Sequence, residues 1–146
     1  MGAKRHERSY ARRCALQMLY QSEILDESPR AIVEAKSFIE EEAVLTDYVI
    51  RLVEGVETNK DAIDVYLKDT SENWSLARMP IVDKSILRLA LYEMIYVEDV
   101  PLSVSINEAV ELAKDFGGED DSPRFVNGVL GYIAKLLEDD DHGKSE

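Results

Sequence analysis

Residues 81–97, IVDKSILRLALYEMIYV, decide the fold class of this chain. Polar side chains stand mainly at four positions of this segment: Asp83, Lys84, Arg88 and Glu93. A helix formed by it would be apolar around most of its circumference, and a helix of that kind is buried on nearly all sides. The segment therefore predicts the central helix of a bundle, with Arg88 and Glu93 taking part in its packing.

The segments on either side of this helix carry apolar residues three or four positions apart, the spacing of a helical face. Alternation of β-branched residues never runs far, so strands are not expected. The patterns predict helices over about residues 4–25, 29–39, 47–67, 104–116 and 123–137. Ser28, Thr46 and Ser103 immediately precede three of these segments and are residue types that cap helices. Gly55 and Asn59 leave open a break in the third segment, so six or seven helices are expected.

The predicted fold class is all-α, a compact bundle of helices in two small, packed subdomains. The most loop-like interior stretch is residues 69–73, which places the boundary between the subdomains near residue 75. One domain would then span residues 1–137, with subdomains at about 1–75 and 76–137. Residues 138–146 are polar and mostly acidic, and they predict a disordered tail.

Charge is distributed unevenly along the chain. The whole chain carries −13, whereas the first twenty residues carry +4, because five cations face the single acid Glu7. These cations are Lys4, Arg5, Arg8, Arg12 and Arg13. Cations near a helix N-terminus oppose the helix dipole, so helix stability does not explain them. The cluster is either a solvated segment or a surface for an anionic partner, and its arginine bias favours phosphate.

No motif in the sequence indicates catalysis, a cofactor or a bound metal. It has no phosphate-binding glycine loop and no Cys or His cluster with metal-ligand spacing. His6 and His142 lie near the termini, and Cys14 lies on an apolar face, as a core thiol would. A single cysteine is consistent with a reducing cytoplasm, and no apolar run approaches the ~18 residues of a membrane span. We therefore expect a cytoplasmic protein without enzymatic activity.

Aromatic residues accompany the basic cluster and could serve it. Tyr10, Tyr20, Phe116 and Phe125 are candidates for stacking on unpaired bases, although for each residue taken alone a core position is favoured. The sequence shows no helix-turn-helix pattern with a basic second helix. Single-stranded RNA is therefore favoured over duplex DNA, and global acidity requires that any such contact be local.

Four segments of the sequence resemble the NusB family of bacterial transcription antitermination factors. They are ARRCALQMLYQ (11–21), WSLARMPIVDKSILRLALYEM (74–94), VPLSVSINEAVELAKDFG (100–117) and RFVNGVLGYIAK (124–135), in the family's order and spacing. The stretch from Ser28 to Thr46 shows little resemblance. The resemblance implies a NusB-like, all-helical fold of two small bundles and RNA binding without catalysis.

The resemblance also implies partners. NusB proteins bind the single-stranded boxA element of nascent ribosomal RNA leaders together with NusE, a small-subunit ribosomal protein. The complex then helps RNA polymerase to read through terminators. Whether the free protein is a monomer or a homodimer that hides the arginine surface stays open.

The resemblance assigns RNA contacts to two segments of this chain. The first contains Lys4, Arg5, Arg8, Arg12 and Tyr20, and the second contains Phe116, Asp121, Arg124, Phe125 and Asn127. Phosphate contacts from Arg8 and Arg12 would supply affinity, while bases placed against the second segment would supply preference. The role of Arg13 stays open. A core anchor is the alternative role for Phe125, as is a helix cap or bridge for Asn127.

Two other functions remain open from the sequence. The first is a helical protein-interaction module without RNA contact. The second is a relative of the NusB-like domain that is fused to ribosomal RNA methyltransferases. That reading is disfavoured because the sequence carries no nucleotide-binding α/β pattern.

Overall fold

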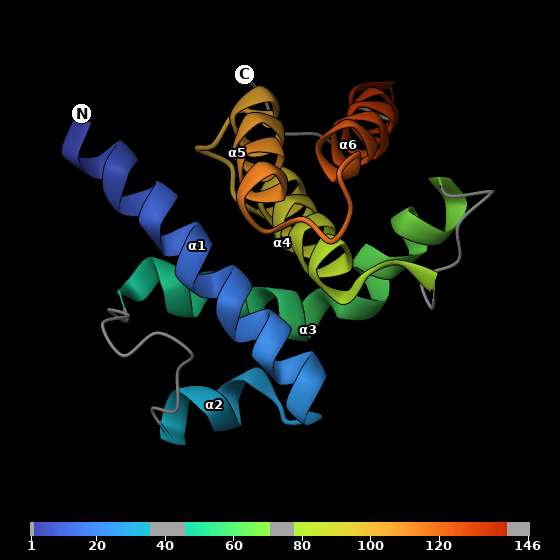
Figure 1. The fold of residues 1–146 in the computed structure, drawn as a ribbon. Coiled ribbons are helices and arrows are strands. Elements are labelled where there is room, and N and C mark those ends of the chain that lie inside the picture. The colour runs from blue at the N-terminus through green and yellow to red at the C-terminus, as the bar shows by residue number, and fades with distance from the viewer. Residues whose placement is uncertain (1, 36–45, 71–77, 140–146) are drawn as a thin grey trace.

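The structure, a computed structural model, describes residues 2–35, 46–70 and 78–139. These residues form helices and no strand (Figure 1). The helices are α1 (Gly2–Leu25), α2 (Pro29–Ala35), α3 (Asp47–Thr70), α4 (Ile81–Tyr96), α5 (Leu102–Phe116) and α6 (Ser122–Asp139). The prediction of an all-α fold is confirmed.

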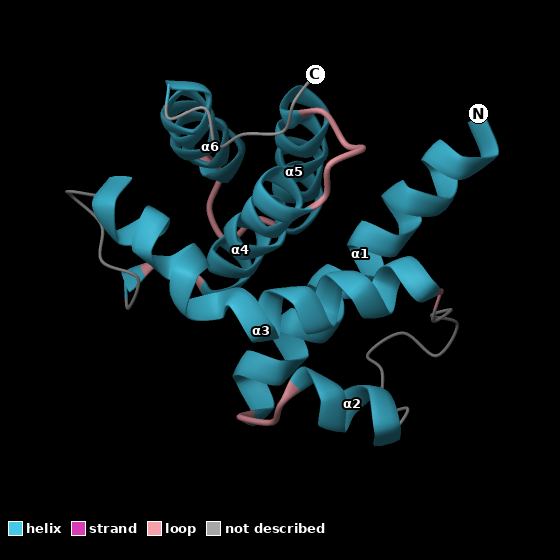
Figure 2. Cartoon of the chain, turned by 180° about the vertical axis from the view of Figure 1, so that it is seen from behind, coloured by secondary structure: helices cyan, strands magenta, loops and turns pink. Residues whose placement is uncertain are grey.

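Helix α4 lies at the centre of the bundle, as its sequence predicts. It packs against α1, α3, α5 and α6, and in the view from behind α5 and α6 lie on one side of it and α3 on the other (Figure 2). Leu87, Leu91 and Met94 on α4 are completely buried. A single hydrophobic core joins residues from all five of these helices. Cys14 on α1 belongs to that core, as expected.

Two of the three predicted helix caps are present. Ser28 Oγ accepts a hydrogen bond from the Ala31 amide at 3.1 Å, and Thr46 Oγ1 accepts one from the Val49 amide at 3.3 Å. The prediction that Ser103 caps the next helix is wrong, because α5 already begins at Leu102. Pro101 stands at the N-cap in an extended conformation and makes no side-chain capping bond, and its fixed φ sets the start of the helix.

Several predicted boundaries fall at or beyond the limits of the described residues. The boundary near residue 75 lies within 71–77, which the structure does not describe. The helix predicted to reach residue 39 is described as far as Ala35. Helix α6 continues to Asp139, so it includes the first two residues of the predicted tail, and 140–146 lie outside the described residues.

Helices α3 and α4 lie close together at Gly55, which does not break α3. A Cβ atom built on Gly55 would lie 2.2 Å from Cζ of Tyr92 on α4. The Tyr92 ring is buried and stacks on Tyr96, with ring centroids 5.3 Å apart. Asn59 donates a hydrogen bond to the Gly55 carbonyl at 2.8 Å, within a continuous helix. The glycine therefore permits close approach of two helices, and the break that the sequence left open is absent.

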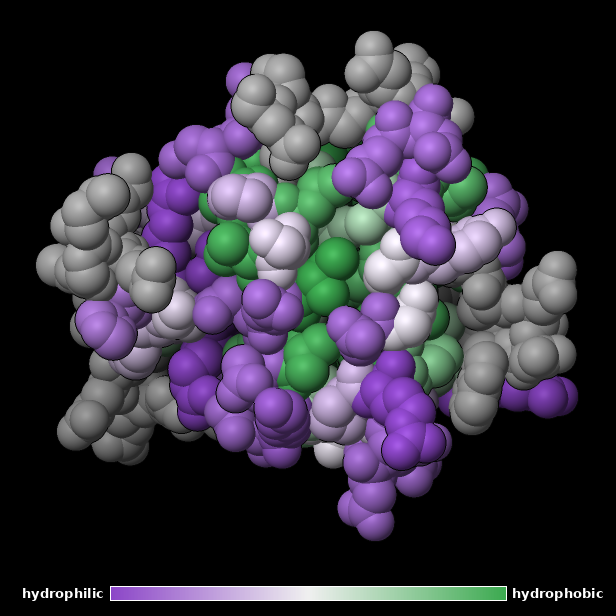
Figure 3. All heavy atoms as spheres, turned by 90° about the horizontal axis from the view of Figure 1, so that it is seen from above, coloured by the Kyte–Doolittle hydropathy of each residue, from purple (hydrophilic) through white to green (hydrophobic). Residues whose placement is uncertain are grey.

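Apolar side chains also reach the surface. Figure 3 looks down on the end of the bundle where α5 and α6 lie, and it shows apolar residues in the middle of this face within a polar rim. Apolar surface enclosed by polar residues is typical of contact sites for other molecules. Within the described residues, no helix combines the length and the apolar character that crossing a membrane requires.

Candidate nucleic-acid interface

A buried carboxylate, that of Glu93 on α4, organises the surroundings of the arginines on α1. Glu93 is 1% exposed and accepts hydrogen bonds from Arg12 Nε at 2.8 Å, from Ser105 Oγ at 3.0 Å and from the Tyr48 hydroxyl. Arg12 is 4% exposed, and its Nη1 lies 3.1 Å from Glu108 Oε1 on α5. Arg12 therefore ties α1 to both α4 and α5.

The ionisation of this network follows from its burial. Burial alone would lower the pKa of Arg12, but the carboxylate of Glu93 outweighs that effect and holds the pKa above its usual value. Burial raises the pKa of the Tyr48 hydroxyl, and the negative charge of Glu93 raises it further. Arg12 therefore stays charged, and the Tyr48 hydroxyl stays protonated and donates to Glu93.

Arg8 lies at the edge of the same network. Its Cζ is 4.4 Å from the centroid of the Tyr48 ring, and its Nη2 is 3.1 Å from Asp99 Oδ2 in the segment between α4 and α5. The Arg8 side chain is 19% exposed and the Asp99 side chain 56%. Arg8 is thus covered on one side by an aromatic ring, while part of it reaches solvent.

Arg13 joins α1 to the C-terminal end of α5. Its Nη1 lies 2.7 Å from Asp115 Oδ2, and its Cζ lies 4.7 Å from the centroid of the Phe116 ring. The side chain of Arg13 is 44% exposed. The structure therefore brings the two predicted RNA-facing segments together through a residue whose role the sequence left open. The sequence carries one indication that Arg13 belongs to this surface: it lies on the same helical flank as Tyr20.

The predicted aromatic residues differ in accessibility. Tyr20 lies two helical turns beyond Arg13 on the same face of α1 and is 36% exposed. Phe116 and Phe125 are partly buried and pack against the hydrophobic core. The alternative role of Phe125 as a core anchor therefore fits the structure. The guanidinium of Arg13 lies over the ring of Phe116.

The remaining predicted residues lie at the surface or at the N-terminus of α1. Asp121, Arg124 and Asn127 are exposed at the start of α6 and just before it. Lys4 and Arg5 belong to the first two turns of α1, and the structure does not describe their side chains. RNA contact by any of the ten residues stays a prediction.

Asp83, which the sequence marked only as a polar position, fixes the segment between α5 and α6. Its side chain is buried, and Oδ1 accepts a hydrogen bond from the Gly118 amide at 3.1 Å. Its Oδ2 accepts one from Ser122 Oγ at 2.8 Å, and Ser122 Oγ accepts in turn from the Glu119 amide. The exposed residues around Asp121 therefore stand on a segment anchored to α4.

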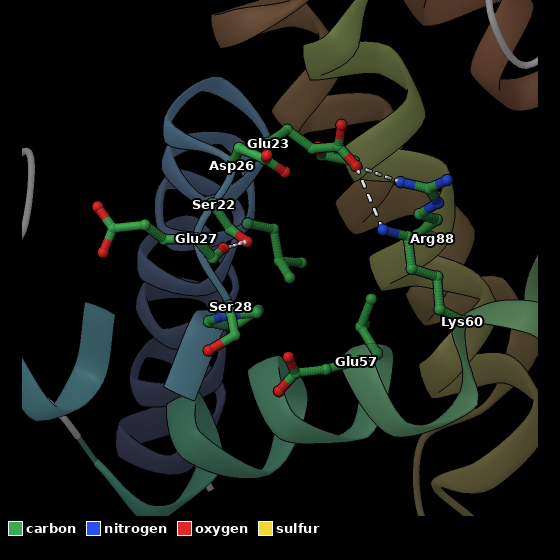
Figure 4. Close-up of a pocket in the computed structure, with 12 residues that line it drawn as sticks. Ser22, Glu23, Asp26, Glu27, Ser28, Glu57, Lys60 and Arg88 are labelled. Atoms are coloured by element: carbon green, nitrogen blue, oxygen red, sulfur yellow. Dashed lines mark hydrogen bonds and ion pairs between the residues drawn. The ribbon is translucent and has the colours of Figure 1, made fainter. Parts of the chain in front are cut away.

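A polar cavity of about 340 Å³ lies between α1, α2, α3 and α4 (Figure 4). Arg88 on its wall donates from Nε and Nη2 to the Asp64 carboxylate and from Nη1 to Glu23, each at 2.9 Å. Lys60 adds a contact of 3.4 Å to Glu23. These ion pairs link the C-terminal half of α1 to α3 and α4. The cavity is lined by neither His nor Cys, and we assign it a structural role.

The ion pairs of Glu23 predict acid sensitivity. Burial would raise the pKa of Glu23, but Lys84, Arg88 and Lys60 outweigh it and hold the pKa below the usual 4.5. Such a carboxylate stabilises the fold above its unfolded pKa, and the stabilisation disappears as the pH falls through its folded pKa. Urea unfolding of the Glu23→Gln variant should therefore show lower stability than the unchanged protein near pH 7, and the difference should shrink below about pH 4.5.

Glu27→Gln is the control for that experiment, because Glu27 is exposed and lies four residues after Glu23, in the segment between α1 and α2. It should leave the unfolding free energy nearly unchanged at every pH. A pH-independent difference between Glu23→Gln and the unchanged protein would show that the charge of Glu23 is not the stabilising element.

The described residues include no group of three or more His, Cys, Asp and Glu side chains that could hold a metal ion. The fold and this surface define a small helical binding protein. Its arginine-bearing helix, α1, lies against the C-terminal end of α5. The chain matches the NusB family over residues 9–135.

Relatives of similar length share much of the sequence. The transcription antitermination protein NusB of Saccharopolyspora erythraea is 44% identical over 88% of this chain and 87% of its own. The corresponding protein of Bacillus cereus strain B4264 is 45% identical over 90% of this chain and 99% of its own. The chain belongs to the NusB family.

Solved structures share the fold. NusB of T. maritima superposes with a TM-score of 0.77 at 36% identity, over 88% of this chain and 90% of that one. A structure of the antitermination factors NusB and NusE in complex with double-stranded RNA gives a TM-score of 0.72 at 26% identity, over 88% of this chain and 96% of that one. The predicted NusB-like fold is confirmed.

Proposed function

We propose that this member of the NusB family is a non-catalytic RNA-binding factor that promotes transcription antitermination. It acts in the cytoplasm, where it binds the single-stranded boxA element of ribosomal RNA leaders together with NusE and supports read-through by RNA polymerase. The family match supports the antitermination role, and the related complex of NusB and NusE with double-stranded RNA supports NusE and RNA as partners, whereas the preference for a single strand rests on the surface described next. The apolar face in Figure 3 supports a protein partner.

One observation carries the RNA-binding proposal: the contact of Arg13 with Asp115 and Phe116. This contact joins two segments that lie far apart in the sequence into one continuous surface. That surface offers guanidinium groups for phosphates and the exposed Tyr20 ring for a base. Unpaired bases can stack on such a ring, which favours a single strand. The chain's net charge of −13 opposes indiscriminate RNA binding.

The role that we propose for Arg12 differs from the role of Arg8. Its guanidinium is buried between Glu93 and Glu108, so a direct phosphate contact requires that Glu108 release Nη1. Arg12 then serves the interface mainly by fixing α1 against α4 and α5. Among the arginines of α1 whose side chains the structure describes, Arg8 and Arg13 are accessible to solvent.

Replacing Arg8 with alanine should weaken binding of a boxA-type single-stranded RNA and flatten its salt dependence. For single strands, the slope of log K against log[salt] is about −0.7 per phosphate contact, so one lost contact should reduce its magnitude by about 0.7. Fluorescence titrations over a range of salt concentrations, with and without NusE, measure both quantities.

Arg30→Ala provides a matched loss of charge. Arg30 lies on α2 and is exposed, with its Nη2 3.7 Å from Glu54 Oε2 on α3, so its removal should leave the slope unchanged. Equal effects of the two substitutions would contradict a phosphate contact at Arg8. Absence of RNA binding even with NusE present would overturn the proposed function.

A helical protein-interaction module without RNA contact is the second candidate. It is favoured by the internal pairing of the α1 arginines, since Arg8, Arg12 and Arg13 each have a carboxylate partner within the chain. This alternative predicts that the protein binds NusE equally well with and without RNA.

Both relatives bear the name of the antitermination protein, so the methyltransferase alternative gains no support. A homodimer that covers α1 in the absence of RNA belongs to the first proposal and is measurable by light scattering.

A further inference from the structure

Tyr48 on α3 connects the buried carboxylate network to the arginine surface. Its side chain is buried, its hydroxyl donates to Glu93, and its ring lies 4.4 Å from Cζ of Arg8. We propose that Tyr48 is a positioning residue for RNA binding, which holds the Arg8 guanidinium in the orientation that meets a phosphate. The inference rests on the proposed function and extends it to a residue outside both predicted segments.

The Tyr48 ring is held at both ends. At its tip, the acceptor Glu93 is itself fixed by Arg12 and Ser105. At its base, Tyr48 occupies the first turn of α3, which Thr46 caps. A ring held in this way is a rigid support. The Arg8 side chain packed on it is therefore already partly ordered, and binding a phosphate costs less side-chain entropy.

The ring and a phosphate would use different parts of the guanidinium. An aromatic ring attracts the flat face of the group, whereas the N–H donors point outward in its plane. One of those donors, Nη2, contacts Asp99 Oδ2 at 3.1 Å. Because Asp99 is largely exposed, this ion pair contributes little to stability, and a phosphate can replace the carboxylate. The stacking on Tyr48 remains compatible with that exchange.

A double-mutant cycle tests the coupling between the two residues. Binding of a boxA-type single-stranded RNA, with NusE present, is measured for the unchanged full-length protein, Arg8→Ala, Tyr48→Leu and the double variant. We expect Tyr48→Leu to weaken binding about threefold to fivefold when Arg8 is present and to have no further effect when Arg8 is alanine. Tyr48→Phe keeps the ring and should retain most of the affinity.

A general structural role for Tyr48 would give a different pattern. Tyr48→Leu would then weaken RNA binding equally with and without Arg8, and this result would overturn the inference while leaving the proposed function intact. If the unchanged protein did not bind RNA, both the inference and the proposed function would be overturned. Thermal unfolding of each variant establishes that it is folded at the temperature of the titration.

A second measurement needs no substitution, and so holds even if Tyr48→Leu does not fold. NMR of the unchanged protein should show the side-chain protons of Arg8 shifted upfield by the ring current of Tyr48. We expect that shift to persist when RNA is bound. Its disappearance on RNA binding would mean that Arg8 leaves the ring to reach the phosphate, which would overturn the inference.

Discussion

Replacing Glu93 with glutamine is expected to lower the free energy of unfolding by about 3–5 kcal/mol, the usual cost of leaving a buried charge without its partner. Glutamine has nearly the shape of glutamate but cannot neutralise Arg12, which is 4% exposed and would keep only the partly exposed Glu108 as an anionic partner. The hydroxyls of Tyr48 and Ser105 would also lose their anionic acceptor. Urea unfolding followed by far-UV circular dichroism measures the change.

Glu98→Gln is the matched control, because Glu98 is exposed in the segment that follows α4. It should alter stability by less than about 0.5 kcal/mol. Removing the buried cation as well, in the double variant with Arg12→Met, should restore part of the loss, since the charge that then loses its partner, Glu108, is partly exposed to solvent. A loss in Glu93→Gln no larger than in Glu98→Gln would contradict the view that this ion pair is buried.

Replacing Gly55 with alanine should destabilise the protein by about 1–3 kcal/mol, the range for overpacked cores. Alanine in place of glycine normally stabilises a helix by about 1 kcal/mol, so the expected sign is reversed here. The reason is the 2.2 Å distance between the new Cβ and Cζ of Tyr92, whose ring is buried and stacked on Tyr96. Thermal and urea unfolding both report the change.

Gly128→Ala on α6 offers the comparison, because no atom beyond its chain neighbours and the adjacent backbone of α6 lies within 4 Å of its Cβ position. This substitution should stabilise the protein by about 0.5–1 kcal/mol. Adding Tyr92→Leu to Gly55→Ala should relieve the clash, so that the two substitutions together cost less than the sum of their separate effects. If Gly55→Ala were as stabilising as Gly128→Ala, close approach of α3 and α4 would not explain the glycine.

The helical architecture could be predicted because its signals are local. The apolar circumference of residues 81–97 admits only a central position, and the caps at Ser28 and Thr46 act within one helical turn. Gly55 was read as a potential break because glycine weakens a helix by itself. Its actual use depends on Tyr92, a residue of another helix, and local patterns do not reveal such a pairing.

The proposed binding surface was predictable in composition and not in arrangement. Charged residues are rarely buried unless they are paired, so an arginine cluster is expected at the surface. Arg12 is buried because Glu93, 81 positions away in the chain, neutralises it. Arg13 meets Asp115 across 102 positions. Neither pairing leaves a trace in the spacing of residues, and both decide which arginines a ligand can reach.

The sharing of Glu93 among four helices has a consequence for how the molecule opens. Arg12 belongs to α1, Tyr48 to α3, Glu93 to α4 and Ser105 to α5. Withdrawal of any of the three donors would leave a buried anion short of a partner. Fraying of α1 alone is therefore costly beyond its first turns. The segments around these residues should open and close as one cooperative unit, so that amide protection in α1 rises and falls with that of the bundle centre.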